Sequence, residues 1–223
     1  MKILLAGDSW GVGTYGTVNG QYQQTGSGIQ GILESKGYKV INVSKSGDSN
    51  NNIVDRIQTD VDHIIFIQTD IFRDHCNFQG DLKILQESFL DQLLEYNSIN
   101  DYIEHYFNCL YSRLNNFSTP ILCVGGWSKL HPCLVNYDKL IPVIPSATEF
   151  LLPQAKDVYL SDFEWFLQLN DHTKIMNKFD SEIKRLALES TAKFDLINQI
   201  WGDVHPTQVG YELLVEKIQK YLL

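Results

Sequence analysis

The apolar positions of the chain gather into five short continuous runs, which longer amphipathic or polar stretches separate. Runs of this length, apolar throughout and rich in β-branched residues, are typical of strands buried in a parallel sheet. They occupy residues 2–6, 38–43, 63–68, 120–124 and 140–144. Because Pro142 lies within the last run and proline is confined to sheet edges, we expect residues 140–144 to form an edge strand.

Helical periodicity fills most of the segments between these runs. It predicts helices over residues 29–36, from residue 53 onward, over 82–117 with a break near 97–100, over 171–188 and over 207–222. Residues 11–28 hold six of the fifteen glycines and predict an extended loop, whereas residues 145–170 show no clear pattern. Strands that alternate with helices predict one α/β domain over residues 1–223, with a mostly parallel sheet covered on both faces. Active residues are expected beyond the carboxyl ends of its strands.

Composition and charge narrow the class of protein. The net charge of -9 and the sequence pI of about 5.0 argue against a nucleic-acid partner and against docking on an anionic membrane. The apolar run before Gly7 is too short for a secretory signal, and no stretch approaches the roughly 18 apolar residues of a membrane span. The cysteines form no C-x-x-C pair, so we expect no metal site and a reduced, cytoplasmic protein.

Two motifs overlap in residues 7–16, which read GDSWGVGTYG. Gly11, Gly13 and Gly16 have the G-x-G-x-x-G spacing of a dinucleotide-binding loop. In that fold the first glycine directly follows the strand, a helix follows the third, and the second strand ends in an acidic residue. Here the first strand ends at Gly7, a polar stretch follows Gly16, and residues 41–44 read INVS. The pattern favours a glycine-rich loop and predicts no cofactor.

The other motif, Gly7-Asp8-Ser9, places a serine just after the first strand, where Gly7 allows the chain to turn. A serine nucleophile needs a base. We predict that His205 is this base, because Pro206 keeps His205 out of the α conformation at the mouth of the last helix. The one rival is His131, which also precedes a proline.

The remaining parts of such a site also have candidates. Asp203 is the nearest carboxylate that could orient the imidazole of His205. Gly47, after the second strand, is a candidate main-chain donor to an oxyanion, and Gln68 and Thr69, after the third strand, are candidate side-chain donors. Because the carboxyl ends of parallel strands meet at one edge, these residues are expected to converge there.

These residues resemble the motifs of the SGNH/GDSL hydrolase family. Gly7-Asp8-Ser9 resembles the family's first motif, SKSGDSNNNI at 44–53 its second through Gly47, and DVHPT at 203–207 its last. The resemblance implies a three-layer α/β/α fold of flavodoxin-like type and serine esterase or acyl-hydrolase chemistry without a cofactor. It also implies that the N–H groups of Ser9 and Gly47 bind the oxyanion. FIQTDIFRD and GGWSKL are similar to uncharacterised bacteriophage members of the family.

The chain departs from the family pattern in two motifs. The third motif, G-x-N-D, reads IQTD here, so Thr69 stands where the family's oxyanion-binding asparagine is expected. Thr69 could donate its hydroxyl hydrogen, or Gln68 or the asparagines at 50–52 could supply the amide. The last motif is D-x-H rather than D-x-x-H, which leaves open a triad with Asp203 or a Ser–His dyad.

The sequence therefore predicts a hydrolase of carboxylic esters, with a small-molecule or glycan ester as substrate. Trp10, Trp127 and Trp165 are candidate stacking surfaces for a sugar, which would favour carbohydrate O-deacetylation. The altered third motif keeps a second hypothesis open, in which the fold is a catalytically weak or inactive binding module. In that case the inserts at 71–118 and 127–170 would contact a glycan or a partner protein.

Overall fold

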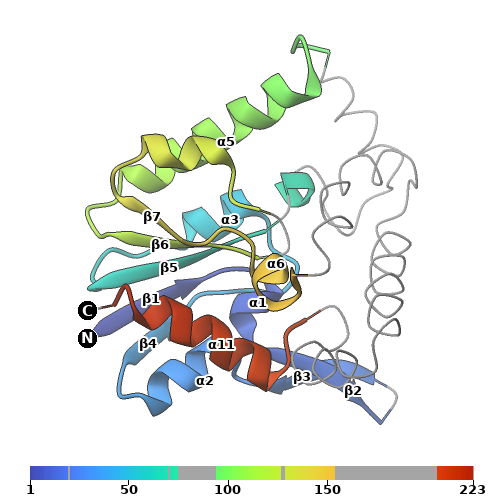
Figure 1. The fold of residues 1–223 in the computed structure, drawn as a ribbon, viewed down its shortest axis with the longest axis vertical. Helices are drawn as coiled ribbons and strands as arrows, with labels where there is room; N and C mark the ends of the chain where they lie inside the picture. Colours follow the sequence, from blue (N-terminus) through green and yellow to red (C-terminus); the bar gives the residue numbers. More distant parts are fainter. Residues whose placement is uncertain (20, 70, 75–93, 127–128, 154–204, 223) are drawn as a thin grey trace.

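A computed structural model of the chain describes residues 1–19, 21–69, 71–74, 94–126, 129–153 and 205–222. Its centre is a sheet of five parallel strands (Figure 1). These are β1 (Lys2–Ala6), β4 (Lys39–Asn42), β5 (His63–Gln68), β6 (Ile121–Gly125) and β7 (Leu140–Ile144), in the spatial order β4-β1-β5-β6-β7. Among the five strands this is the order 2-1-3-4-5, which is flavodoxin-like. The prediction of an α/β fold with about five parallel strands is confirmed.

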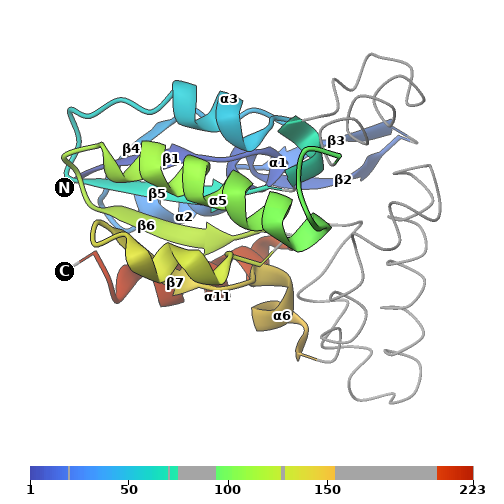
Figure 2. The ribbon, with the colours of Figure 1, turned by 90° about the horizontal axis from the view of Figure 1, so that it is seen from above.

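Helices cover both faces of the sheet (Figures 1 and 2). One face packs against α2 (Gly28–Ser35) and α11 (Gln208–Gln219), and the other packs against α3 (Asn50–Asp55) and α5 (Ile99–Asn115). Successive residues of β1 alternate between the two cores, since Ile3 and Leu5 lie in the first and Leu4 and Ala6 in the second. Burial on both faces explains the apolar interiors of β1, β5 and β6, whereas β4, at the edge of the sheet, is only partly buried.

The edge strand and several helix starts follow from local chemistry. β7 occupies the predicted residues at the edge of the sheet, where Pro142 lies opposite Cys123. Ser98 caps α5 by accepting a hydrogen bond from Asp101 N–H, so the predicted break near 97–100 is the start of this helix. Ser49 caps α3 in the same way, and α3 therefore begins at Asn50, before the expected residue 53.

The prediction of an extended loop over residues 11–28 was wrong. Residues 9–12 form the short helix α1 (Ser9–Val12), and β2 (Thr14–Val18) pairs antiparallel with β3 (Gln21–Gly26). Threonine, tyrosine and valine favour strands, and the Asn19-Gly20 dipeptide between the two strands is a strong hairpin signal that the glycine count concealed. Gly11 therefore lies in α1, Gly13 caps the end of α1 and Gly16 lies in β2, so the three glycines do not form a loop that leads into a helix.

Short elements complete the described chain: η1 (Ile71–Asp74), η2 (Pro132–Asn136) and α6 (Ala147–Leu151). The helix predicted over 171–188 and part of the one predicted over 82–117 lie outside the described residues. In the described ranges, no helix combines the length and apolar character that crossing a membrane requires.

Candidate active site

Ser9 lies at the carboxyl edge of the sheet, at the N-terminus of α1. Asp8 caps this helix by accepting a hydrogen bond from Trp10 N–H over 3.0 Å, which leaves Ser9 as the first helical residue. The turn from β1 requires a glycine, because a Cβ at Gly7 would lie 2.9 Å from Ile67 Cβ. The sequence thus brings the hydroxyl of Ser9 and the N-terminus of a helix to the same point.

His205 faces Ser9 from the other end of the chain. Its Nε2 lies 2.8 Å from Ser9 Oγ, and both residues are buried, at 8% and 6% exposure. Two residues later Thr207, in extended backbone, caps α11 through a hydrogen bond from Gly210 N–H. His205 therefore stands just outside the helix, as Pro206 predicted, and the structure brings this predicted pair together.

Two aromatic rings lie beside the imidazole of His205. The ring centroids of Tyr15 in β2 and Trp10 in α1 are 4.9 Å and 6.3 Å from that of His205. Trp10 is buried in the core at 4% exposure, so it does not offer the predicted stacking face for a sugar. Trp127 and Trp165 lie outside the described residues, and so does Asp203.

The rival histidine has another role. His131 caps η2, its ring stacks on Phe107, and its Nδ1 lies 3.0 Å from Cys133 Sγ. Burial lowers the pKa of His131 and raises that of the Cys133 thiol to about 11. Both changes favour neutral side chains, so this pair is a structural contact and not a second nucleophile.

Gly47 occupies an exposed turn in the segment that follows β4. The N–H of Asp48 donates to Lys45 O over 3.2 Å, and Gly47 has a φ of 77°. A positive φ at the third residue of such a turn defines type II, which favours glycine there. Lys45 N–H donates to Gly7 O over 3.1 Å, so the Gly47 turn is attached to the segment that carries Ser9.

Thr69 contacts the site through Asp8. Its Oγ1 donates to Asp8 Oδ2 over 2.9 Å, and both residues are buried. A hydroxyl has only one hydrogen, so the predicted donation from Thr69 to an oxyanion would require this hydrogen bond to break. In the structure, Thr69 instead orients the carboxylate that caps the Ser9 helix.

Two of the candidate substitute amides are committed to the protein interior. Asn50 is fully buried, donates to Thr69 O and accepts from Thr69 N–H, with both distances 2.9 Å. Gln68 is also fully buried, donates to Lys129 O over 2.7 Å and accepts from the Tyr111 hydroxyl over 2.6 Å. Asn50 also donates to the Tyr106 hydroxyl over 3.1 Å, so both of its amide hydrogens have acceptors. Which group takes the place of the family asparagine stays a prediction.

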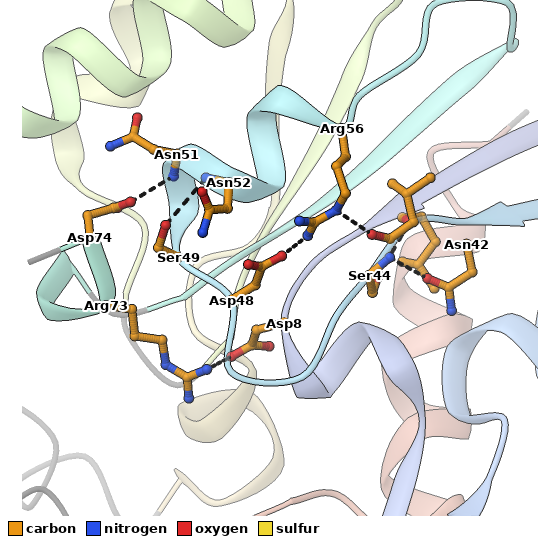
Figure 3. Close-up of polar contacts among 12 residues, drawn as sticks. Asp8, Asn42, Ser44, Asp48, Ser49, Asn51, Asn52, Arg56, Arg73 and Asp74 are labelled. Atoms are coloured by element: carbon orange, nitrogen blue, oxygen red, sulfur yellow. Dashed lines mark hydrogen bonds and ion pairs between the residues drawn. The ribbon is translucent and has the colours of Figure 1, made fainter. Parts of the chain in front are cut away.

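Arg73 is a site residue that sequence reasoning missed. Its Nη1 lies 3.2 Å from Asp8 Oδ2, and its side chain is 14% exposed (Figure 3). Nearby, Asp74 accepts hydrogen bonds from Asn51 N–H and from the Tyr106 hydroxyl, and burial followed by the Asp74 charge raises the pKa of Tyr106. The one available signal was an arginine in the segment after a strand end, which is too common to single out.

The arrangement places a serine hydroxyl and a histidine imidazole in hydrogen-bond contact at the carboxyl edge of the sheet. A distance of 2.8 Å is within the reach needed for proton transfer from a hydroxyl to an imidazole. Among the described residues, no three His, Cys, Asp or Glu side chains are placed to hold a metal ion together.

Comparison with protein-family models found no match for the chain, and comparison with curated protein sequences found none either. Solved structures with similar coordinates include LAE5, an alpha/beta hydrolase enzyme from the metagenome of Lake Arreo, Spain. It is 13% identical with a TM-score of 0.45, over 98% of this chain and 93% of that one. TesA is 15% identical with a TM-score of 0.40, and the match covers 100% of this chain and 98% of TesA. The psychrotrophic esterase EstA from Pseudoalteromonas sp. is 13% identical with a TM-score of 0.40, and the match covers 99% of this chain and 98% of EstA. The flavodoxin-like fold of this chain follows from its own strand order.

Proposed function

We propose that the protein is a serine hydrolase of carboxylic esters, with Ser9 as nucleophile and His205 as general base. The observation that carries the proposal is the 2.8 Å contact between Ser9 Oγ and His205 Nε2. The likeness of the segments around Ser9, Gly47 and His205 to the SGNH/GDSL motifs supports the same proposal from the sequence.

The reaction would run in two halves. In the first, His205 Nε2 takes the hydroxyl proton while Ser9 Oγ bonds to the ester carbonyl carbon. The imidazolium then gives this proton to the leaving alcohol as the carbon–oxygen bond breaks, which leaves an acyl ester on Ser9. In the second half, His205 takes a proton from water, the resulting hydroxide attacks the acyl carbon, and Ser9 regains its proton as the acid departs.

Charge on the tetrahedral intermediate needs fixed donors. The N–H of Ser9 belongs to the first turn of α1, where main-chain N–H groups lack partners within the helix. The N–H of Gly47, on the adjacent turn, would be the second donor. Asp203 remains the proposed orienting group for His205.

A second candidate function is a binding module with weak or no turnover. One observation favours it, since the Thr69 hydroxyl is directed to Asp8 and the amides of Asn50 and Gln68 are engaged elsewhere.

The same observation bears on the speed of the proposed enzyme. Loss of one oxyanion donor lowers a rate by about 10²–10³-fold, so the enzyme we propose is a slow one. Its proposed substrate is a small-molecule or glycan ester.

The test is the turnover of p-nitrophenyl acetate by the wild type, Ser9→Ala and a matched Ser35→Ala control. Ser35 lies on α2 and donates its hydroxyl hydrogen to Ile32 O, away from the site. The proposal expects Ser9→Ala to fall to the background rate while Ser35→Ala stays at the wild-type rate. Equal rates in Ser9→Ala and wild type would rule out Ser9 catalysis. Saturable ligand binding without turnover would favour the binding module.

A further inference from the structure

The segment of residues 43–49 carries Gly47 from β4 to α3, and its first half is fastened to the Ser9 segment. The N–H of Val43 donates to Leu5 O over 2.9 Å. Asn42 donates to Gly11 O over 2.8 Å and accepts from Ser44 N–H over 2.9 Å. These contacts connect the start of the segment with both β1 and α1.

The second half of the segment is held by the guanidinium group of Arg56 and by the Ser49 cap of α3. Arg56, at the C-terminus of α3, donates from Nε to Val43 O over 2.9 Å, and its Nη2 is hydrogen-bonded to Asp48 Oδ2. Figure 3 shows the Arg56 side chain extending from α3 to Asp48. Asp48 is buried, at 7% side-chain exposure, whereas Arg56 is 33% exposed. Arg56 thus joins the residue that opens the segment to the residue directly after Gly47.

We infer that Arg56 is a positioning residue for the main-chain N–H of Gly47, acting through Asp48. This inference rests on the proposed function, in which that N–H binds the oxyanion. Gly47 itself is exposed, and beyond its two chain neighbours no described atom lies within 4 Å of the place its Cβ would take. The direction of its N–H therefore depends on the flanking residues, of which Asp48 is held from outside the turn. The planar fork of arginine suits this geometry, since one side chain reaches two acceptors in fixed directions.

The first test is Arg56→Gln, assayed as kcat and KM on p-nitrophenyl acetate. An oxyanion donor stabilises only the transition state. Its displacement should therefore lower kcat by about 10- to 10²-fold and leave KM within about two-fold of wild type. Arg113→Gln is the matched control. Arg113 lies on α5 and pairs over 2.6 Å, at an exposed site, with Asp55 of α3, the helix that ends beside Arg56. This control should keep the wild-type kcat.

A second variant separates positioning from stability. Arg56→Gln leaves the buried Asp48 carboxylate without its cation, which destabilises the fold for reasons unrelated to catalysis. The double variant Asp48→Asn/Arg56→Gln removes that charge and should regain most of the lost Tm. If Arg56 positions Gly47, kcat of the double variant stays low after Tm recovers. If Arg56 only neutralises Asp48, kcat and Tm recover together, and the inference is overturned.

Failure of the inference and failure of the proposed function give different results. Ser9-dependent turnover in the wild type together with a wild-type kcat in Arg56→Gln overturns the inference alone. Absence of Ser9-dependent turnover in the folded wild type overturns both.

Discussion

The hydroxyl of Tyr211 donates a hydrogen bond to the main-chain carbonyl of Gly13 over 3.0 Å, although 198 residues separate the two. Tyr211 is fully buried in α11, and Gly13 caps the C-terminus of α1. This contact joins the helix that follows His205 to the helix that begins at Ser9. The distance between the proposed nucleophile and base therefore depends on how α11 sits against α1.

Replacing Tyr211 by phenylalanine should separate the two helices slightly. Tyr211→Phe removes the hydroxyl and leaves the Gly13 carbonyl without this donor, which should lower the free energy of unfolding by about 1–3 kcal/mol. Urea denaturation measures the change. Tyr221→Phe is the control, because Tyr221 is 37% exposed and the loss of its hydroxyl should change the free energy of unfolding little. The same free energy of unfolding in both variants would count against a structural role for the Tyr211 hydroxyl.

The sheet could be predicted from the sequence because burial on both faces leaves a local signature. Residues 63–68 and 140–144 are strands with the predicted bounds, since each has an apolar interior. The β2–β3 hairpin was missed because its strands are polar and lie apart from the five-stranded sheet. There the turn dipeptide Asn19-Gly20 is a better guide than hydrophobicity.

The candidate site residues, too, could be predicted only where the sequence around them carries a local signal. Ser9 and His205 could be predicted because each has local cues, a strand end and a following proline. The Asp8–Thr69 contact joins residues 61 apart through one hydroxyl, and the sequence around Thr69 has no sign of which way that hydroxyl points. The role of Asp203 and the similarity to bacteriophage proteins stay predictions.

Gly47 and Gly37 form a matched pair for testing the oxyanion donor. Both are exposed, both have positive φ, at 77° and 88°, and a Cβ at either would have no described atom within 4 Å beyond its chain neighbours. Alanine at either position should cost about 1–2 kcal/mol of backbone strain. Only Gly47→Ala should also lower kcat, because relief of that strain turns the Gly47 N–H. A steady-state assay with both variants decides this, and an equal kcat in the two would remove Gly47 from the site.

Thr69 should tolerate serine and not valine. Thr69→Ser keeps the hydroxyl that donates to the buried Asp8, whereas Thr69→Val removes a hydrogen bond to a charged group, worth about 1.5–3 kcal/mol. Thermal unfolding should show a lower Tm for Thr69→Val, with kcat reduced because Asp8 caps the Ser9 helix. A Thr69→Val variant as stable and as active as Thr69→Ser would show that the contact is dispensable.

The described cysteines should differ in alkylation. Burial raises the pKa of Cys133 to about 11 and raises that of the fully buried Cys123 further, whereas Cys109 is exposed. The thiolate is the reactive form, so a raised pKa leaves roughly 10⁻³ of Cys133 reactive near pH 8. Iodoacetamide should label Cys109 first, and Cys133 labelling should accelerate as the pH rises toward 11. Peptide mass spectrometry over a pH series checks the order, and faster labelling of Cys133 near pH 8 would contradict it.

The most direct test of the central claim is the rate at which a fluorophosphonate modifies Ser9, followed by intact-protein mass in wild type, Ser9→Ala and His205→Gln. A histidine base speeds attack by a serine hydroxyl by about 10²–10⁴-fold. The 2.8 Å contact therefore predicts one adduct in the wild type, none at this site in Ser9→Ala, and a rate lower by that factor in His205→Gln. A folded wild type without an adduct on Ser9, or His205→Gln labelled as fast as wild type, would contradict the claim that Ser9 and His205 work as a nucleophile and its base.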